Sequence, residues 1–139
     1  MFKNILVPVD LTKKNKQALD IAVKIGLHAK SKIYLLHVVQ TIASTSFSEF
    51  EDFYRTLEER AKKNIDKLIT PYKKNKLPME GKITFGNRVA EILSFASKNK
   101  IDLIVMNSHK ITPKEPTEHW GTISYKVGIL SQCPVMLVK

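Results

Sequence analysis

The chain opens with Phe2-Lys3-Asn4-Ile5-Leu6-Val7-Pro8-Val9-Asp10, an apolar run that ends in a carboxylate. Residues 5–9 are continuously apolar over the length of one strand, which is typical of a strand buried on both faces of a parallel sheet. Further runs of this kind, one of them shorter, predict four more strands, at residues 33–39, 82–85, 103–106 and 135–138.

Helical periodicity occupies the segments between the predicted strands. The first helix carries apolar residues at the i, i+3, i+4, i+7 spacing of one face, namely Ala18, Ile21, Ala22 and Ile25. Thr12 is predicted to cap this helix and Gly26 to end it. Three later helices are predicted over residues 50–68, 89–96 and 124–130. The aromatic stripe of the second, Phe50, Phe53 and Tyr54, is interpreted as core or dimer surface.

The alternation of strands and helices defines the fold class. It indicates an α/β domain with a parallel sheet, right-handed crossovers and helices on both faces. A length of 139 residues suits a single domain, 1–139. Ligands bind such sheets beyond the C-terminal ends of the strands, where the strand order switches. Asp10, residues 38–40 and residues 106–110 fall at those ends and form the candidate site.

The formal net charge of +10 is nearly all lysine, since arginine occurs only at Arg55, Arg60 and Arg88. Arginine is favoured for base readout and bidentate phosphate contacts, and the lysines are scattered through every segment. We therefore interpret the charge as a solvated surface, with a nucleic-acid-associated protein as the alternative.

Composition also bears on the compartment. No apolar run approaches the roughly 20 residues of a membrane helix, and the N-terminus lacks the pattern of a signal peptide. The single cysteine, Cys133, cannot form an internal disulfide, which agrees with a reducing compartment. These features predict a cytoplasmic protein without membrane contact.

Four segments, by their order and spacing, resemble the universal stress protein family over nearly the whole chain. They are Lys3-Asn4-Ile5-Leu6-Val7-Pro8-Val9-Asp10 with Ala18-Leu19 in the following helix; Leu35-Leu36-His37-Val38-Val39; Gly86-Asn87-Arg88-Val89-Ala90-Glu91-Ile92 leading to Asp102-Leu103-Ile104-Val105-Met106; and Gly121-Thr122 through Cys133-Pro134-Val135-Met136-Leu137-Val138. The resemblance implies a flavodoxin-like or adenine-nucleotide α-hydrolase-like α/β/α sandwich, with a mainly parallel five-stranded sheet in the order 3-2-1-4-5. It also implies a stress-response role and a homodimer formed through the last strand, Val135–Val138.

The resemblance further implies a nucleotide site, because the family divides into members that bind ATP and members that do not. ATP-binding members carry a G-x-x-G segment after the fourth strand and a Gly-Ser/Thr pair at the start of the last helix. By position, Asp10 would contact the ribose or adenine region and Val38 would meet adenine through its backbone. Gly121 and Thr122 would donate to phosphate at a helix N-terminus. The complete candidate set for ATP, with Mg²⁺, is Pro8, Val9, Asp10, Val38, Met106, Asn107, Lys110, Gly121, Thr122 and Ile123.

The sequence departs from the family pattern in the phosphate loop, where Asn107 and Lys110 replace the two glycines. Glycine serves there because the backbone must approach phosphate closely and adopt positive φ. Asparagine tolerates the left-handed region better than lysine does, although Lys110 adds a charge that could hold phosphate. Two hypotheses therefore stand: an adenine-nucleotide-binding protein, and a family member that acts through protein contacts alone.

The same residues also have purely structural interpretations. Asp10 could cap the first helix or its turn, and Thr122 could be an ordinary N-cap. His37 lies inside a strand and is interpreted as packed and hydrogen-bonded. The sequence has no nucleophile elbow, P-loop or cluster of metal ligands. We therefore predict no catalytic residue and no metal site, and at most slow ATP hydrolysis.

Overall fold

The computed structural model describes residues 1–114 and 122–139. The strands are β1 (Asn4–Pro8), β2 (Lys32–Gln40), β3 (Met79–Gly86), β4 (Leu103–Asn107) and β5 (Val135–Val138). The α-helices are α1 (Asn15–Ala29), α2 (Glu51–Ile69), α3 (Arg88–Lys98) and α4 (Ile123–Leu130), with 3₁₀ turns η1 (Phe47–Phe50) and η2 (Thr70–Asn75). Every strand pairing is parallel and the order is β3-β2-β1-β4-β5. The predicted fold class and strand order are confirmed.

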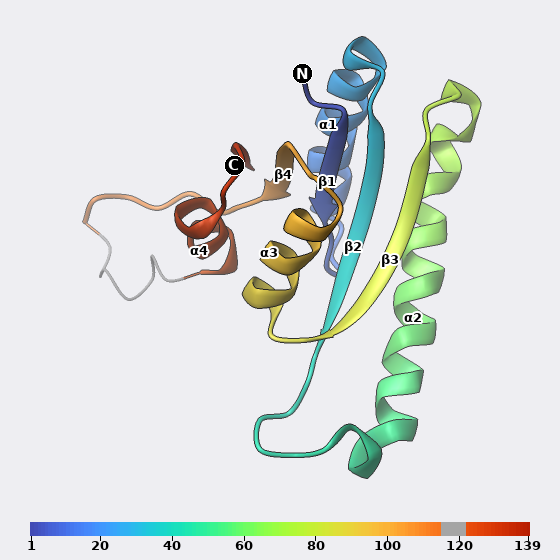
Figure 1. Cartoon of the computed structure of the whole chain (residues 1–139), viewed down its shortest axis with the longest axis vertical. Helices are drawn as coiled ribbons and strands as arrows, with labels where there is room; N and C mark the ends of the chain where they lie inside the picture. Colours follow the sequence, from blue (N-terminus) through green and yellow to red (C-terminus); the bar gives the residue numbers. More distant parts are fainter. Residues whose placement is uncertain (115–121) are drawn as a thin grey trace.

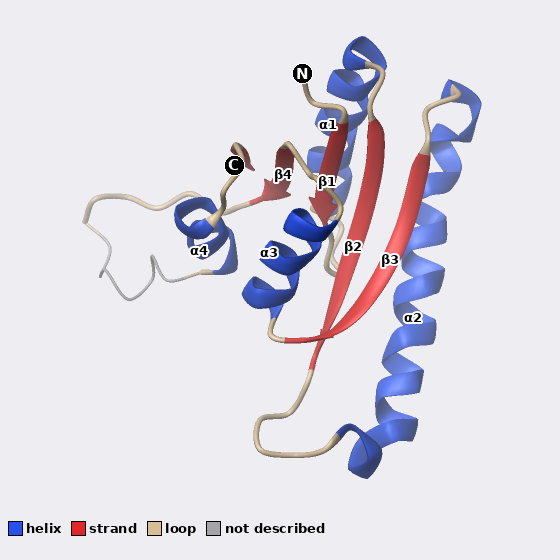
Figure 2. Ribbon diagram, viewed as in Figure 1, coloured by secondary structure: helices blue, strands red, loops and turns tan. Residues whose placement is uncertain are grey.

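The sheet separates two hydrophobic clusters, as the alternation of side chains along a strand requires. Figure 2 shows α1 and α3 on opposite faces of the sheet. Ile5 and Val7 of β1 pack with buried residues of α1 and α2 on one face. Leu6, between them, packs with residues of α3 and α4 on the other face. Ile5, Leu6 and Val7 are fully buried although they point to both faces, which explains the unbroken apolar sequence of β1.

The limits of α1 differ from the prediction. The helix begins at Asn15 with Lys14 as N-cap, because Thr12 is hydrogen-bonded to Asp10 instead of capping the helix. It continues past Gly26 to Ala29 and ends at Lys30, whose φ is 55°. Gly26 is small for a packing reason, since a Cβ there would lie 3.2 Å from side-chain atoms of Ile33 and Leu77.

The third strand is longer than the predicted residues 82–85. It begins at Met79 and pairs with β2 along eight positions, from Ile33–Met79 to Gln40–Gly86. Glu80 and Gly81 have low strand propensity, so sequence pattern missed this half of the strand. Hydrogen bonding to β2 stabilises the extended backbone of these residues, which their local propensity does not favour.

The β2–β3 pair and α2 form one end of the molecule. Pairing between β1 and β2 stops at Pro8–Leu36, whereas pairing between β2 and β3 continues to Gln40–Gly86. Figure 1 shows α2 running along this extension, with the β2–α2 loop at its far end. Of the helices within residues 1–114 and 122–139, none has both the length and the apolar character to cross a bilayer.

Candidate functional site

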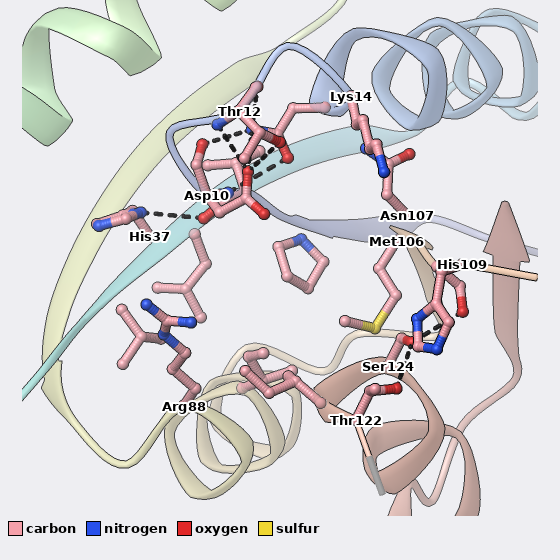
Figure 3. Close-up of a pocket in the computed structure, with 18 residues that line it drawn as sticks. Asp10, Thr12, Lys14, His37, Arg88, Met106, Asn107, His109, Thr122 and Ser124 are labelled. Atoms are coloured by element: carbon pink, nitrogen blue, oxygen red, sulfur yellow. Dashed lines mark hydrogen bonds between the residues drawn. The ribbon is translucent and has the colours of Figure 1, made fainter. Parts of the chain in front are cut away.

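A cavity of about 370 Å³ lies at the C-terminal ends of β1, β2 and β4 (Figure 3). In the sheet, β2 lies on one side of β1 and β4 lies on the other, so the strand order switches between β1 and β4. This is the position at which parallel α/β sheets bind their ligands. The cavity volume falls within the range of small-molecule sites.

Most of the residues singled out in the sequence meet at this cavity. Its walls include Pro8, Val9, Asp10, Val38, Met106, Asn107, Thr122 and Ile123. Lys110 is exposed and does not line the cavity. Gly121 lies outside the described residues. The structure therefore brings the β1, β2, β4 and α4 parts of the candidate set together and leaves Lys110 apart.

Asp10 is held in place through one carboxylate oxygen. Its Oδ1 accepts hydrogen bonds from the Thr12 backbone N–H at 2.8 Å, the Thr12 hydroxyl at 2.6 Å and Asn15 Nδ2 at 3.1 Å. The buried Asn15 also accepts from the Asp10 N–H at 3.2 Å. No described residue donates to Oδ2 of Asp10, so this oxygen is available at the cavity wall. The interpretation of Asp10 as a residue that caps the turn is correct. Because only Oδ1 makes these contacts, Oδ2 can bind a ligand.

The Asp10 carboxyl remains ionised despite its partial burial. Burial by itself would raise its pKa, but hydrogen bonds from Thr12 and Asn15 and the positive charge of Arg88 hold the pKa below its ordinary value. Asp10 is therefore an anion at neutral pH and can accept hydrogen bonds from ligand hydroxyls.

His37 lines the same cavity from β2. Its Nδ1 lies 3.0 Å from the Val9 carbonyl oxygen, and because a carbonyl only accepts, Nδ1 carries the proton. The side chain is 9% exposed. His37 is packed and hydrogen-bonded, as the sequence interpretation held, and it fixes the backbone just before Asp10.

Three hydroxyls gather at the N-terminus of α4, across the cavity from Asp10 and Thr12 (Figure 3). Ser108 Oγ lies 2.8 Å from Ser124 Oγ, and Thr122 Oγ1 lies 3.4 Å from the same atom. Thr122 is the N-cap residue by position, but its side chain makes no capping hydrogen bond. These hydroxyls accompany the positive end of a helix dipole, which favours an anion.

Asn107, the first replaced glycine position, ends β4 at the cavity wall. Both polar atoms of its carboxamide are buried without a hydrogen-bond partner among the described residues. Such a group destabilises a fold by about 1–3 kcal/mol. Asn107 thus places an unsatisfied donor and acceptor where glycine would have offered only its backbone.

Sequence reasoning missed two cations of the site, Arg88 and Lys14. Arg88 reaches the cavity from the start of α3, and Lys14 lines it from the turn before α1 (Figure 3). His109, which also lines the cavity, falls within the predicted residues 106–110. Asp10 is the one carboxylate among the described lining residues. Arg88 could have been found, because it follows the third strand and therefore lies at the same edge of the parallel sheet as Asp10. The cavity is accordingly suited to an anionic ligand with hydroxyl groups.

Comparison with known proteins agrees with this fold. The model of the universal stress protein family matches residues 1–139, and the chain belongs to that family. Universal stress protein YxiE of Bacillus subtilis is 28% identical over 149 residues, which cover 100% of both chains. Universal stress protein MJ0531 of Methanocaldococcus jannaschii is 25% identical over 144 residues, covering 100% of this chain and 83% of the relative.

Solved structures share the fold along the whole chain. The protein MJ0577 is 26% identical with a TM-score of 0.78, covering 100% of this chain and 96% of that one. The universal stress protein of Archaeoglobus fulgidus in complex with dAMP is 17% identical with a TM-score of 0.71, covering 100% of both chains. A universal stress protein in complex with cAMP is 16% identical with a TM-score of 0.73, covering 99% and 97%. Adenine nucleotides are therefore ligands of structural relatives.

Proposed function

We propose that this protein is a cytoplasmic, homodimeric regulator of the stress response that binds an adenine nucleotide in the cavity between Asp10 and Thr122. The observation that carries the proposal is the composition of that cavity. A cavity of about 370 Å³ brings together one ionised carboxylate, hydroxyls at a helix N-terminus and the cations Arg88 and Lys14. The dAMP and cAMP complexes of relatives with the same fold support an adenine nucleotide as the ligand.

The ligand orientation follows from the charges. Asp10 Oδ2 would accept from the ribose hydroxyls, because a carboxylate repels phosphate. Phosphate would lie toward the hydroxyls of Ser108, Thr122 and Ser124, where the dipole of α4 attracts an anion. Arg88 would add a charge-assisted contact that does not depend on the replaced glycines. ATP with Mg²⁺ remains one candidate among the adenine nucleotides.

The homodimer is proposed from the contrast between the two edges of the sheet. The β3 edge carries Glu80 and Lys82, and charges of this kind protect an edge strand from further pairing. The β5 edge, Val-Met-Leu-Val, has no charge, and β4 is its one partner among the described strands. Met136 of β5 and the neighbouring Ile129 and Leu130 of α4 are exposed by 39%, 82% and 54%. A second copy pairing along β5 would cover this apolar edge.

Calorimetric titration of the protein with AMP, ADP and ATP, each with and without Mg²⁺, tests the nucleotide proposal. We expect binding in the micromolar range and a loss of about tenfold or more in Arg88→Gln, because a charged hydrogen bond to phosphate is removed. Lys98→Gln is the matched control, since it removes one exposed cation at the other end of α3. Equal affinities for both variants would exclude the assigned role of Arg88.

The double variant Asn107→Gly, Lys110→Gly separates the two family hypotheses. If the wild type binds nucleotide, the site works without the two glycines of the family pattern. If only the double glycine variant binds, the proposal fails, and the chain is a family member that acts through protein contacts. Absence of binding by both proteins would likewise remove nucleotide binding as the function.

A further inference from the structure

Four apolar side chains form an exposed patch at the end of the molecule built by β2, β3 and α2. Ile42, Phe47, Phe50 and Phe53 are exposed by 44%, 45%, 36% and 52%. They lie on the β2–α2 loop, on η1 and on the first turn of α2, at the far end of the extension in Figure 1. We refer to these four residues as the aromatic patch.

The aromatic patch rests on a rigid base. Tyr54 is fully buried beneath it, with its ring centroid 5.2 Å from that of Phe47 and 5.7 Å from that of Phe53. Phe85 of β3 meets Phe47 edge-on at 5.3 Å. The Tyr54 hydroxyl accepts a hydrogen bond from the Ile42 N–H at 2.8 Å, which ties the loop to α2. The exposed rings are therefore held in place before any partner arrives, which lowers the entropy lost on binding.

Neither the nucleotide cavity nor the β5 edge accounts for the aromatic patch. None of its four residues lines the cavity. The strands beneath it, β2 and β3, lie at the opposite side of the sheet from β5. The patch would stay exposed in a dimer formed through β5, and exposed apolar clusters on a folded protein mark interaction surfaces.

The charges around the aromatic patch oppose those of the rest of the chain. Residues 41–59 contain five carboxylates, Glu49, Glu51, Asp52, Glu58 and Glu59, and one cation, Arg55. The chain as a whole carries +10. Arg55 is paired with Glu51 at 2.6 Å, whereas exposed Glu49 and Asp52 have no ion pair within the described part of the chain. Exposed carboxylates beside an apolar centre complement a partner that has cations beside apolar side chains.

We propose that the aromatic patch, with Glu49 and Asp52, is a docking surface for a basic amphipathic segment of another protein. The partner's apolar side chains would pack on Phe47, Phe50 and Phe53, while its lysines or arginines would face the two carboxylates. Partner cations could also lie over the phenylalanine rings. Another protein fits better than a second copy of this chain. Within residues 1–114 and 122–139, the large apolar residues exposed outside the aromatic patch are the isolated Leu11 and Leu27, the terminal Met1 and the group at the β5 edge.

Fluorescence anisotropy with a labelled synthetic helix tests the docking surface. The probe is a peptide of about 18 residues, five helical turns, with leucine on one face and lysine on the other. One control peptide has the same composition in an order without a common face, and a second replaces lysine by glutamate. We expect the wild type to bind the amphipathic basic peptide at least about tenfold more tightly than either control.

Two variants assign the binding to the aromatic patch. Phe53→Ser removes an exposed ring, and the double variant Glu49→Gln, Asp52→Asn removes charge without altering packing. Each is expected to weaken peptide binding about tenfold. Leu27→Ser is the matched control, because Leu27 is 49% exposed on α1, away from the patch. Unchanged binding in both test variants, or no binding of the basic peptide by the wild type, would overturn the proposal.

Sedimentation of the protein alone tests whether a second copy of this chain binds the aromatic patch. The proposal expects the same oligomeric state for the wild type and Phe53→Ser over a range of concentrations. If Phe53→Ser, but not Leu27→Ser, dissociates an assembly, the patch binds a second copy of this chain and the proposal is wrong.

Discussion

Asp10 shows how a single residue joins structure and function in this protein. One carboxylate oxygen accepts three hydrogen bonds that shape the β1–α1 turn, and the other remains at the cavity. Because these contacts lower the pKa of Asp10, its stabilising contribution is present above its ordinary pKa and is lost as the pH falls through the lowered value. The turn and the proposed site should therefore weaken together in acid.

Glu80 offers a sharper test of pH dependence. Hydrogen bonds from Lys32 and Lys82, at 2.8 and 2.7 Å, lower the pKa of its carboxyl to about 2 from an ordinary value of 4.5. We expect Glu80→Gln to reduce the melting temperature slightly at pH 7, because the contacts are exposed and screened by solvent. The difference from wild type should shrink as the pH falls from about 4.5 toward 2, where Glu80 itself becomes neutral.

Glu59→Gln is the control for this measurement, since Glu59 is exposed and has no ion pair among the described residues. Thermal unfolding of the wild type, Glu80→Gln and Glu59→Gln between pH 2 and pH 7 would measure how the difference in melting temperature depends on pH. A difference between wild type and Glu80→Gln that does not change with pH would exclude the ion pairs as its cause.

Among the secondary-structure elements, the contact between α2 and β3 depends on one glycine. A Cβ at Gly81 would lie 2.4 Å from Ile65 Cγ2, closer than real Cβ atoms approach. Gly81→Ala should therefore lower the free energy of unfolding by about 1–3 kcal/mol through overpacking. Urea denaturation would measure this loss. The substitution Ile65→Leu removes the branched methyl, so the same alanine should destabilise less in that background.

Gly128→Ala in α4 is the matched control. Its Cβ would meet Leu137 Cδ1 at an ordinary 3.8 Å, and it lies inside a helix. We expect no loss of stability, or a gain of up to about 1 kcal/mol from the higher helix propensity of alanine. Similar destabilisation by both alanines would contradict the packing explanation for Gly81.

At the scale of the whole molecule, the β5 edge is the centre of the proposed dimer interface. Val135 and Leu137 pack against the cluster that contains Leu6 and Ile104, so lysine at either position would also disturb the fold. Met136 is exposed and offers a cleaner test. Met136→Lys should shift the protein from dimer to monomer, because it places a charge in the paired edge.

Light scattering coupled to a sizing column would measure this shift. Leu11→Lys, which alters an apolar residue of similar exposure in the β1–α1 loop, should leave the dimer intact. A Met136→Lys protein that remains dimeric would show that the subunits do not associate through β5.

Much of the fold was predictable because a strand that is buried on both faces has a continuous apolar sequence. The apolar runs of β1 and β2 and the periodic face of α1 each report the environment of their own element. Two of the predictions that failed concern residues that serve another purpose than the sequence suggested. Gly26 suggested a helix end but provides room for Ile33 and Leu77, and Thr12 suggested a cap but binds Asp10.

By itself, then, the sequence determined the α/β class, the presence of the strands and helices, the candidate edge of the sheet and, through family resemblance, the strand order. The tertiary structure alone decided that Arg88 and Lys14 line the cavity while Lys110 does not. It also decided that Phe50 and Phe53 face outward around a buried Tyr54. The physical reason is that apolar periodicity records the burial of each element separately. Which polar side chains converge, and which apolar ones stay exposed, depends on how elements distant in the chain pack together.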